Sequence, residues 1–306
     1  MKILITGAAG FIASHIQDAY LNEGHQVAVV DNLVTGKKEN LNPKSHFFEM
    51  DILDPKLHDV FETFRPDIVS HHAAQMDVRR SVSDPTYDAQ VNVLGFINLL
   101  EASRKVGVQK VIFASSGGAV YGEQDHFPAD ETHPTRPASP YGLTKMVGEE
   151  YLKLYERLYG LQYTALRYAN IYGPRQNPHG EAGVVAIFCK KLLSEETPTI
   201  NGDGKQTRDY VFVKDVVNAN LMALKEEASG IYNIGTSVES DVNQLFSHLA
   251  KHSGKNLVQH GPAKLGEQLR SVISYQKVEK AWGWKPEYDF ERGLQETFEW
   301  FKTHNK

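Results

Sequence analysis

A tyrosine and a lysine stand four residues apart at Tyr141 and Lys145, directly after the dipeptide Ser139-Pro140. Serine followed by proline is a typical helix start, so we expect both side chains on one face of a helix that runs to Tyr159. A lysine ammonium beside a phenol stabilises the phenolate and lowers its pKa. A tyrosine tuned in this way can remove the proton of a hydroxyl group while hydride leaves the same carbon.

The four-residue spacing recurs elsewhere in the chain. Tyr210 and Lys214 repeat it inside the apolar run Tyr210–Val213, which is typical of a strand and has no helix cap. We therefore favour Tyr141 and Lys145 as the functional pair, with an ordinary pair on a helix surface as the alternative interpretation.

A glycine-rich turn near the start of the chain predicts a dinucleotide site. The segment Gly7–Ala13 has the spacing G-x-x-G-x-x-A and lies between an apolar run and a helical pattern. Gly7 permits a tight turn, Gly10 lets backbone N–H groups approach a pyrophosphate at the helix N-terminus, and Ala13 is small enough for helix–strand packing. A turn that binds nothing is the alternative.

A carboxylate follows the second apolar run. Asp31 comes directly after Gln26–Val30, where an acidic side chain can accept hydrogen bonds from the adenosine ribose hydroxyls and repel a 2′-phosphate. NAD is therefore favoured over NADP, with a turn residue at a strand end as the alternative.

Short runs rich in Val and Ile alternate with amphipathic stretches over the first 170 residues. Several runs lack polar alternation, which suits strands buried on both faces of a parallel sheet. Between them, Asp84-Pro85 predicts the start of a helix that runs to about Lys105. The alternation predicts an α/β fold with a doubly wound parallel sheet, a Rossmann fold. We expect strands at Ile3–Thr6, Gln26–Val30, His46–Met50, Asp67–Ser70, Val111–Ser115 and Gln162–Arg167.

The rhythm changes after about Ile171, where Gly and Pro punctuate the chain. We predict a dinucleotide-binding domain over 1–170, with a return segment near 205–240. A smaller α/β substrate-binding domain is expected over 171–204 and 241–306, at the C-terminal side of the sheet. Its predicted elements, with those of the return segment, are a strand at Tyr210–Val213, a helix from Val216, a strand at Gly230–Gly235, and helices at Val242–His252 and Glu291–Lys302.

Composition and charge exclude several classes of protein. The 306 residues are 41% hydrophobic, and a net charge of −5 offers no basic footprint for nucleic acid or an anionic membrane. Cys189 is the single cysteine, and His248 and His252 have no evident third ligand, so we predict no metal site. No apolar run reaches the length of a membrane span, and the first residues are typical of a strand instead of a secretory signal. We expect a cytoplasmic protein.

Together these motifs resemble the extended short-chain dehydrogenase/reductase family, in its NAD-dependent epimerase/dehydratase branch. The likeness covers nearly the whole chain and is strongest to the UDP-glucose 4-epimerases of that branch. Besides the segments above, it rests on Asp51-Ile52, His72–Ala74, Ser115–Gly122, Arg167–Pro174, Asn201–Gly204 and Thr207–Tyr210.

The resemblance implies a role for each matching position. Tyr141 would be the catalytic base, and Lys145 would tune it and bind the nicotinamide ribose. Asn170 and Arg208 would hold the diphosphate of a UDP-sugar, the arginine through a charge-assisted fork. The implied NAD-binding residues are Gly7, Gly10, Phe11, Ile12, Asp31, Asn32, Asp51, Ile52, Ala73, Ala74, Asn92, Ser115, Tyr141, Lys145 and Tyr168.

Three positions depart from the family pattern. Gly117 stands where the branch usually carries a catalytic Ser or Thr, and Ser116 is the nearest hydroxyl that could replace it. Lys264 replaces the usual arginine of the substrate site and neutralises phosphate without bidentate geometry. Ser271, seven positions further on, is small, which would leave room for a 2-acetamido group as well as a plain hexose.

Epimerisation fits these residues better than dehydration. A 4,6-dehydratase needs an acid pair directly after the Ser/Thr position, and Gly118 and Ala119 cannot transfer a proton. The resemblance therefore implies a nucleotide-sugar 4-epimerase for UDP-glucose and UDP-galactose, with N-acetylhexosamine forms as further candidates. It would act through a transient 4-keto sugar, with the reduced cofactor kept bound. A dehydratase or 4-keto reductase of the same family, or a non-catalytic dinucleotide sensor, are the alternatives.

The family also implies an assembly. Its usual homodimer pairs the helix after Asp84 with the helix after Ser139 in a four-helix contact, so we expect a homodimer by analogy.

Overall fold

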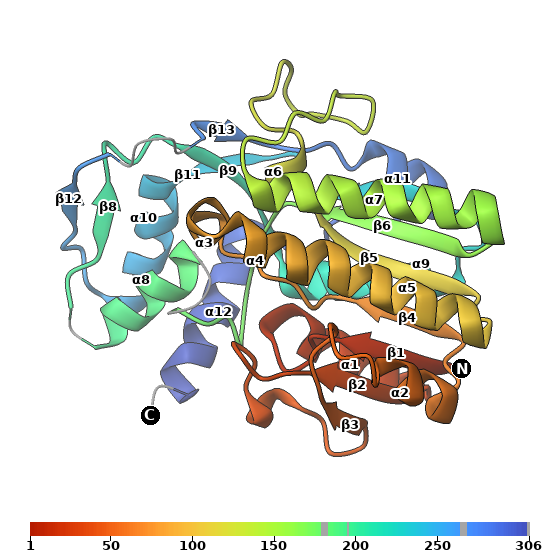
Figure 1. Ribbon diagram of the computed structural model, residues 1–306. Coiled ribbons are helices and arrows are strands. Elements are labelled where there is room, and N and C mark those ends of the chain that lie inside the picture. Colours follow the sequence, from red (N-terminus) through yellow and green to blue (C-terminus); the bar gives the residue numbers. More distant parts are fainter. Residues whose placement is uncertain (179–182, 195, 264–267, 305–306) are drawn as a thin grey trace.

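The computed structural model describes residues 1–178, 183–194, 196–263 and 268–304. Figure 1 shows a large layered part, which holds a broad sheet, and a smaller part beside it that comes mainly from the second half of the chain. Within the described ranges, no helix has both the length and the apolar character needed to cross a membrane.

Seven parallel strands form the large sheet, in the order β10-β6-β5-β4-β1-β2-β3. Their direction of progression reverses between β1 and β4, which makes this place the topological switch point where such sheets bind ligands. The predicted α/β fold with a doubly wound parallel sheet is confirmed. The strands are β1 (Lys2–Thr6), β2 (Gln26–Asp31), β3 (His46–Glu49), β4 (Ile68–His71), β5 (Lys110–Ser116), β6 (Gln162–Tyr168) and β10 (Gly230–Ile234).

Helices cover both faces of this sheet because successive strand side chains point to opposite faces. Ile3 and Ile5 pack into a core on one face, and Leu4, between them, packs into a core on the other. All three side chains are fully buried. The first core contains α1 (Phe11–Asn22), α9 (Val213–Lys225) and α11 (Gln276–Trp282). The second contains α2 (Leu57–Phe64), α5 (Gly95–Val106) and α7 (Pro140–Tyr159), and Figure 1 shows α5 and α7 side by side on that face.

Helix α7 begins and ends where the sequence predicts. The Ser139 hydroxyl accepts a hydrogen bond from the Gly142 N–H at 3.1 Å, and Pro140 takes the first helical position. Gly160 ends the helix with φ of 70°, a left-handed conformation that favours glycine. Tyr141 therefore lies in the first turn of α7, near the carboxyl end of the preceding strand β5.

The helix predicted from 85 to about 105 is confirmed, and it contains one π-helical turn that the sequence did not predict. Asp84 caps α4 (Pro85–Ala89), a π-helical segment follows at Gln90–Leu94, and α5 continues from there. Within the π segment, Asn92 turns its side chain to Gln75, accepting from its N–H and donating to its carbonyl, both at 2.8 Å. Such a long-range bond leaves no periodic signal, so the pattern of apolar residues could not reveal it.

A smaller group of strands and helices lies beside the large sheet. Four strands form one sheet, β7 (Asn170–Tyr172), β9 (Thr207–Phe212), β11 (Glu239–Asp241) and β13 (Arg270–Ser271), and β8 (Thr199–Asn201) pairs with β12 (Gln259–Gly261). A separate core joins them to α8 (Val184–Leu193), α10 (Val242–Ser253) and α12 (Phe290–His304). Strand β9 pairs here, whereas α9 and β10 return to the large sheet. The predicted domain boundaries stay a prediction.

Candidate active site

A pocket of about 350 Å³ opens at the switch point of the large sheet. The ends of β1, β2, β4 and β5 and the start of α7 contribute to its wall. All the residues that the sequence suggested for NAD line it except Asn92, which lies behind the wall and holds the Gln75 backbone. The suggested residues that line it are Gly7, Gly10, Phe11, Ile12, Asp31, Asn32, Asp51, Ile52, Ala73, Ala74, Ser115, Tyr141, Lys145 and Tyr168.

The glycine turn leaves no room for side chains. Gly7 has φ of 76°, and a Cβ on it would lie 2.7 Å from the Ala73 nitrogen. Gly10 precedes α1 without any side-chain cap, so the first N–H groups of this helix stay available at the pocket wall. A bare helix N-terminus behind a tight glycine turn fits a dinucleotide pyrophosphate.

Asp31 holds the glycine turn and faces the pocket. Its carboxylate accepts hydrogen bonds from the Ala9 N–H at 2.9 Å and the Leu33 N–H at 2.8 Å. Burial raises the pKa of this carboxyl above its ordinary value, and the two backbone bonds oppose the rise. A carboxylate fixed at this wall fits ribose hydroxyls and disfavours a phosphate.

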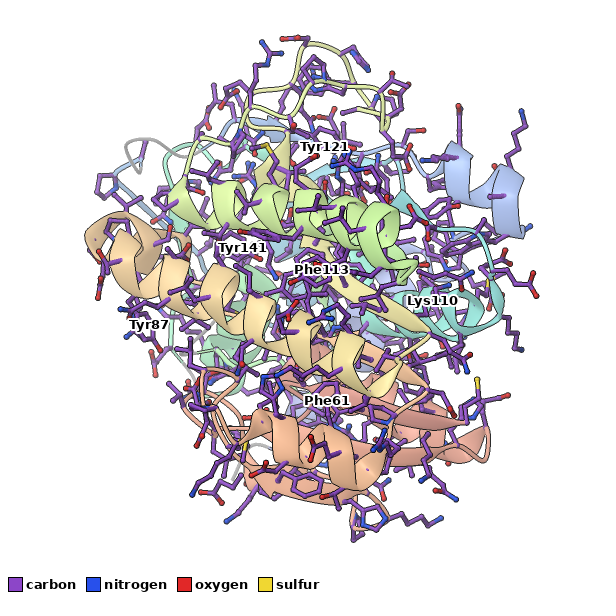
Figure 2. The ribbon with its side chains drawn as sticks, turned by 45° about the vertical axis from the view of Figure 1, so that its right-hand side comes forward. Phe61, Tyr87, Lys110, Phe113, Tyr121 and Tyr141 are labelled. Atoms are coloured by element: carbon purple, nitrogen blue, oxygen red, sulfur yellow. The ribbon has the colours of Figure 1, made fainter. Side chains whose placement is uncertain are left out.

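Tyr141 and Lys145 lie together at the other end of the pocket. The Lys145 Nζ donates to the Ala114 carbonyl at 2.8 Å and lies 5.8 Å from the centre of the Tyr141 ring. Burial lowers the pKa of Lys145 to about 8, while the charges of Asp88 and Glu149 act to raise it. Figure 2 shows Tyr141 near the start of α7. A lysine cation at this distance stabilises a phenolate.

A buried ion pair supports this end of the pocket, and the sequence interpretation missed it. Arg167 donates from Nε and Nη2 to Glu149 at 2.8 and 2.6 Å, and from Nη1 to the Tyr121 hydroxyl. The Ser115 hydroxyl donates to the same Glu149 carboxylate at 2.6 Å. The pair joins α7 to β5 and β6 behind the pocket.

The three residues at and after the end of β5, Ser116, Gly117 and Gly118, face different surroundings. A Cβ on Gly117 would lie 2.7 Å from Cδ1 of the buried Ile273, so position 117 points into the core. Ser116 is half-buried at the last position of β5 and does not belong to the pocket wall. Gly118, in α6 (Gly117–Val120), faces outward to Asn170 and Ser271.

Three of the suggested substrate residues lie on adjacent strands of the smaller sheet, away from the pocket wall. Asn170 is on β7, which pairs with β9, and Arg208 on β9 stands opposite Ser271 on β13. A Cβ on Gly118 would lie 3.7 Å from the Asn170 Oδ1 and 4.0 Å from the Ser271 Oγ. These side chains therefore gather beyond the end of β5. Lys264 lies outside the described residues.

The matching family model supplies the decisive comparison. Residues 3–235 match the NAD dependent epimerase/dehydratase family. The chain belongs to this family. Its cofactor is therefore NAD, in agreement with the glycine turn and the Asp31 carboxylate.

Individual members of the family are similar over their full length. The chain is 43% identical to a UDP-glucose 4-epimerase of Mycolicibacterium smegmatis, with 100% of both chains covered. A crystal structure of UDP-glucose 4-epimerase from Thermotoga maritima with UDP-glucose shares 47% identity, covers 100% of both chains and has a TM-score of 0.98. The Thermus thermophilus UDP-glucose 4-epimerase in complex with NAD shares 45% identity over 99% of both chains, with a TM-score of 0.94.

Arg80 is a further residue of the pocket wall that sequence reasoning did not select. It lies on the short helix α3 (Val78–Ser83), and its guanidinium stacks over the Tyr87 ring at 4.0 Å. Figure 2 shows Tyr87 and Tyr141 toward the same end of neighbouring helices. A repeated charge such as Arg79-Arg80 is typical of a solvated surface, and the sequence alone therefore favours that interpretation over a place in the cleft.

No metal is implied by the arrangement. Across the ranges that the structure describes, no three His, Cys, Asp or Glu side chains gather in a group that could hold a metal ion. In this NAD-dependent family, the side chains at the pocket suit proton transfer at a substrate hydroxyl beside a dinucleotide.

Proposed function

We propose that this protein is an NAD-dependent nucleotide-sugar 4-epimerase that interconverts UDP-glucose and UDP-galactose. The observation that carries the proposal is the position of Tyr141 and Lys145, which line the same switch-point pocket as the glycine turn. The relatives that share 43–47% identity over the whole chain are UDP-glucose 4-epimerases, which supports the same substrate.

The chain's own residues handle the proton of the sugar C4 hydroxyl. Tyr141 takes this proton as the C4 hydroxyl is oxidised to a ketone and returns it when the hydroxyl is restored. Lys145 holds a positive charge 5.8 Å from the centre of the Tyr141 ring and favours the phenolate form of this side chain. When bound, NAD supplies an acceptor for the hydride that leaves C4 and returns to it. Ser116 is the proposed hydroxyl that orients the C4 oxygen, directly or through a water molecule.

The proposed epimerase needs firm contacts to the nucleotide and loose contacts to the sugar, since the ketone must present either face. We assign Asn170, Arg208 and Lys264 to the diphosphate, where binding energy comes from a part of the substrate that does not react. Ser271 and Gly118 leave room beside the sugar, which supports acceptance of a 2-acetamido group. Gly118 and Ala119 offer no acid for the elimination that a dehydratase performs.

Two properties of the proposed enzyme rest on analogy with the family. The homodimer would form through α5 and α7, where Leu158 is 56% exposed and Tyr159 51% exposed. The cytoplasmic location stays a prediction from sequence.

The test is incubation of the purified protein with a panel of UDP-sugars and no added cofactor, followed by separation of the C4 epimers. Interconversion of UDP-glucose and UDP-galactose, with NAD carried through purification, supports the proposal. Stoichiometric consumption of NAD(P)H would indicate a 4-keto reductase, and a 4-keto-6-deoxy product would indicate a dehydratase. NAD binding with no turnover of any UDP-sugar would indicate a sensor.

A further inference from the structure

Lys145 and Asp88 are two buried side chains of opposite charge. Lys145 is 5% exposed and Asp88 is 0% exposed. Among the described residues, neither side chain forms a salt bridge, with the other or with any third group. A buried charge without a counter-charge is costly. Whether Lys145 stays an ammonium therefore depends on the negative charges of the carboxylates near it.

The Asp88 carboxylate accepts three side-chain hydrogen bonds, one of them from Gln75 in the wall of the NAD pocket. Its Oδ1 accepts from the Gln75 Nε2 at 2.9 Å and the Asn92 Nδ2 at 3.2 Å. Its Oδ2 accepts from the Thr144 hydroxyl at 2.9 Å. All three partners are donors, which is the environment of an ionised carboxylate. Asp88 thus joins α4 and the π segment to the residue next to Lys145.

Glu149 is the other carboxylate near Lys145, one turn further along α7. Its charge is already balanced, because both of its oxygens accept from the Arg167 guanidinium. No basic side chain balances Asp88 within hydrogen-bond distance in the described part of the chain. Asp88 is therefore the carboxylate whose negative charge is available to stabilise the Lys145 ammonium.

Other titratable groups around Lys145 do not supply this counter-charge. His71 and His72, at the end of β4, are kept neutral by burial and by the lysine itself, since both effects lower the pKa of each imidazole. Burial raises the pKa of the Tyr168 phenol, which keeps it neutral, whereas Tyr141 is the group on which the lysine charge acts and is an anion only as its phenolate. The remaining groups facing this region are Tyr141 on α7, Arg167 and Tyr168 on β6, and Arg80 on α3.

We propose that Asp88 is the buried counter-charge of Lys145 and a positioning residue for the reaction. It holds Lys145 as an ammonium, and through Thr144 it fixes the helical turn that carries Tyr141. The Tyr141 carbonyl oxygen, 3.0 Å from the Thr144 hydroxyl, is the alternative acceptor for that hydroxyl proton, so the Asp88 carboxylate competes for it. The catalytic part of this inference rests on the proposed function, whereas the charge coupling does not.

The coupling is measured by urea unfolding of the NAD-saturated protein, as a double-mutant cycle of Asp88→Asn and Lys145→Met. At pH 6.5, where Lys145 is charged, we expect the unfolding constants to reveal a coupling of about tenfold between the two positions. At pH 9.5 the coupling should fall below about twofold, because burial lowers the pKa of Lys145 to about 8 and the ammonium is then lost. Thr144→Val is the matched control: it removes the hydroxyl bond, leaves the Asp88 charge and should change stability equally at both pH values.

A purely structural Asp88 gives a different result. Asp88→Asn would then change the unfolding constant by one factor at both pH values and in both lysine backgrounds, which would overturn the proposal. This readout needs no turnover, so a protein that proved not to epimerise UDP-sugars would leave it intact.

A second, kinetic test measures the alkaline limb of the pH profile, which is the fall of kcat/KM as the pH rises. Asp88→Asn should move this limb to lower pH by about one unit. The kcat/KM of the variant should then be about tenfold lower at pH 8.5 than at pH 7. Asp88→Glu keeps the charge and should restore the original limb even if kcat falls, and it decides the matter if Asp88→Asn does not fold. A limb that moves as far in Asp88→Glu as in Asp88→Asn contradicts the proposal.

Discussion

The Lys145 ammonium lies 5.8 Å from the centre of the Tyr141 ring and is held there by the Ala114 carbonyl at the end of β5. A strand of the large sheet thus fixes the cation, and the first turn of α7 fixes the phenol. Their relation does not depend on a flexible loop, because both elements have buried cores.

Replacement of Tyr141 by phenylalanine should abolish most of the activity without unfolding the protein. Loss of a positioned general base costs about 10²- to 10⁴-fold in rate, and the ring that packs on α7 is kept. Chromatography of UDP-glucose and UDP-galactose measures the loss. Tyr210→Phe is the control, because Tyr210 shares the four-residue spacing to a lysine but lies on β9. Equal losses in both variants would contradict the assignment of the base.

Activity should decline above pH about 8, where Lys145 loses its proton. The folded pKa lies below the ordinary value of 10.5, so the unfolded chain binds more protons than the folded one between these two values. The contribution of Lys145 to the free energy of unfolding therefore rises with pH across that window while activity falls. A pH profile of kcat/KM together with urea midpoints measures both trends. Parallel loss of activity and stability would contradict this explanation.

A serine at position 117 should not improve catalysis. Its Cβ would lie 2.7 Å from the Ile273 Cδ1 in a filled core, and such overpacking costs about 1–3 kcal/mol. Ser116→Ala should instead slow epimerisation by about tenfold or more with no change in melting temperature. Thermal melts and initial rates of the two variants separate these effects. A faster Gly117→Ser enzyme would show that the hydroxyl belongs at that position.

A bulky side chain at position 271 should change substrate choice. Ser271 is buried beside Arg208 and Gly118, so Ser271→Tyr fills the space that we assign to a 2-acetamido group. The wild-type protein should turn over both UDP-glucose and UDP-N-acetylglucosamine, and the variant should lose the second substrate selectively. Rates for the two substrates measure this selectivity. Complete refusal of the acetamido sugar by the wild-type protein would refute the steric reasoning.

The sequence predicts those parts of the fold that local patterns encode. Buried strands appear as Val- and Ile-rich runs, and Ser139 and Gly160 mark the ends of α7, because caps and periodicity act over a few residues. The wall of the pocket was predictable for the same reason, since glycine turns and strand ends meet at the switch point of any such sheet.

The support of the site was not predictable in this way. Asp88 contacts Thr144 and Glu149 contacts Arg167 only because separate helices and strands fold against each other. The π segment around Asn92 depends on a partner far along the chain. The packing of Gly117 on Ile273 likewise needs the folded structure.

The central claim, that the C4 hydroxyl is oxidised and restored within one pocket, is tested most directly with UDP-glucose deuterated at C4. After incubation in ordinary water, mass spectrometry and NMR locate the label in the UDP-galactose formed. The account predicts that the product keeps deuterium at C4, because the same hydride returns to the same carbon. Product that has lost this deuterium, or no UDP-galactose at all from NAD-loaded protein, would contradict it.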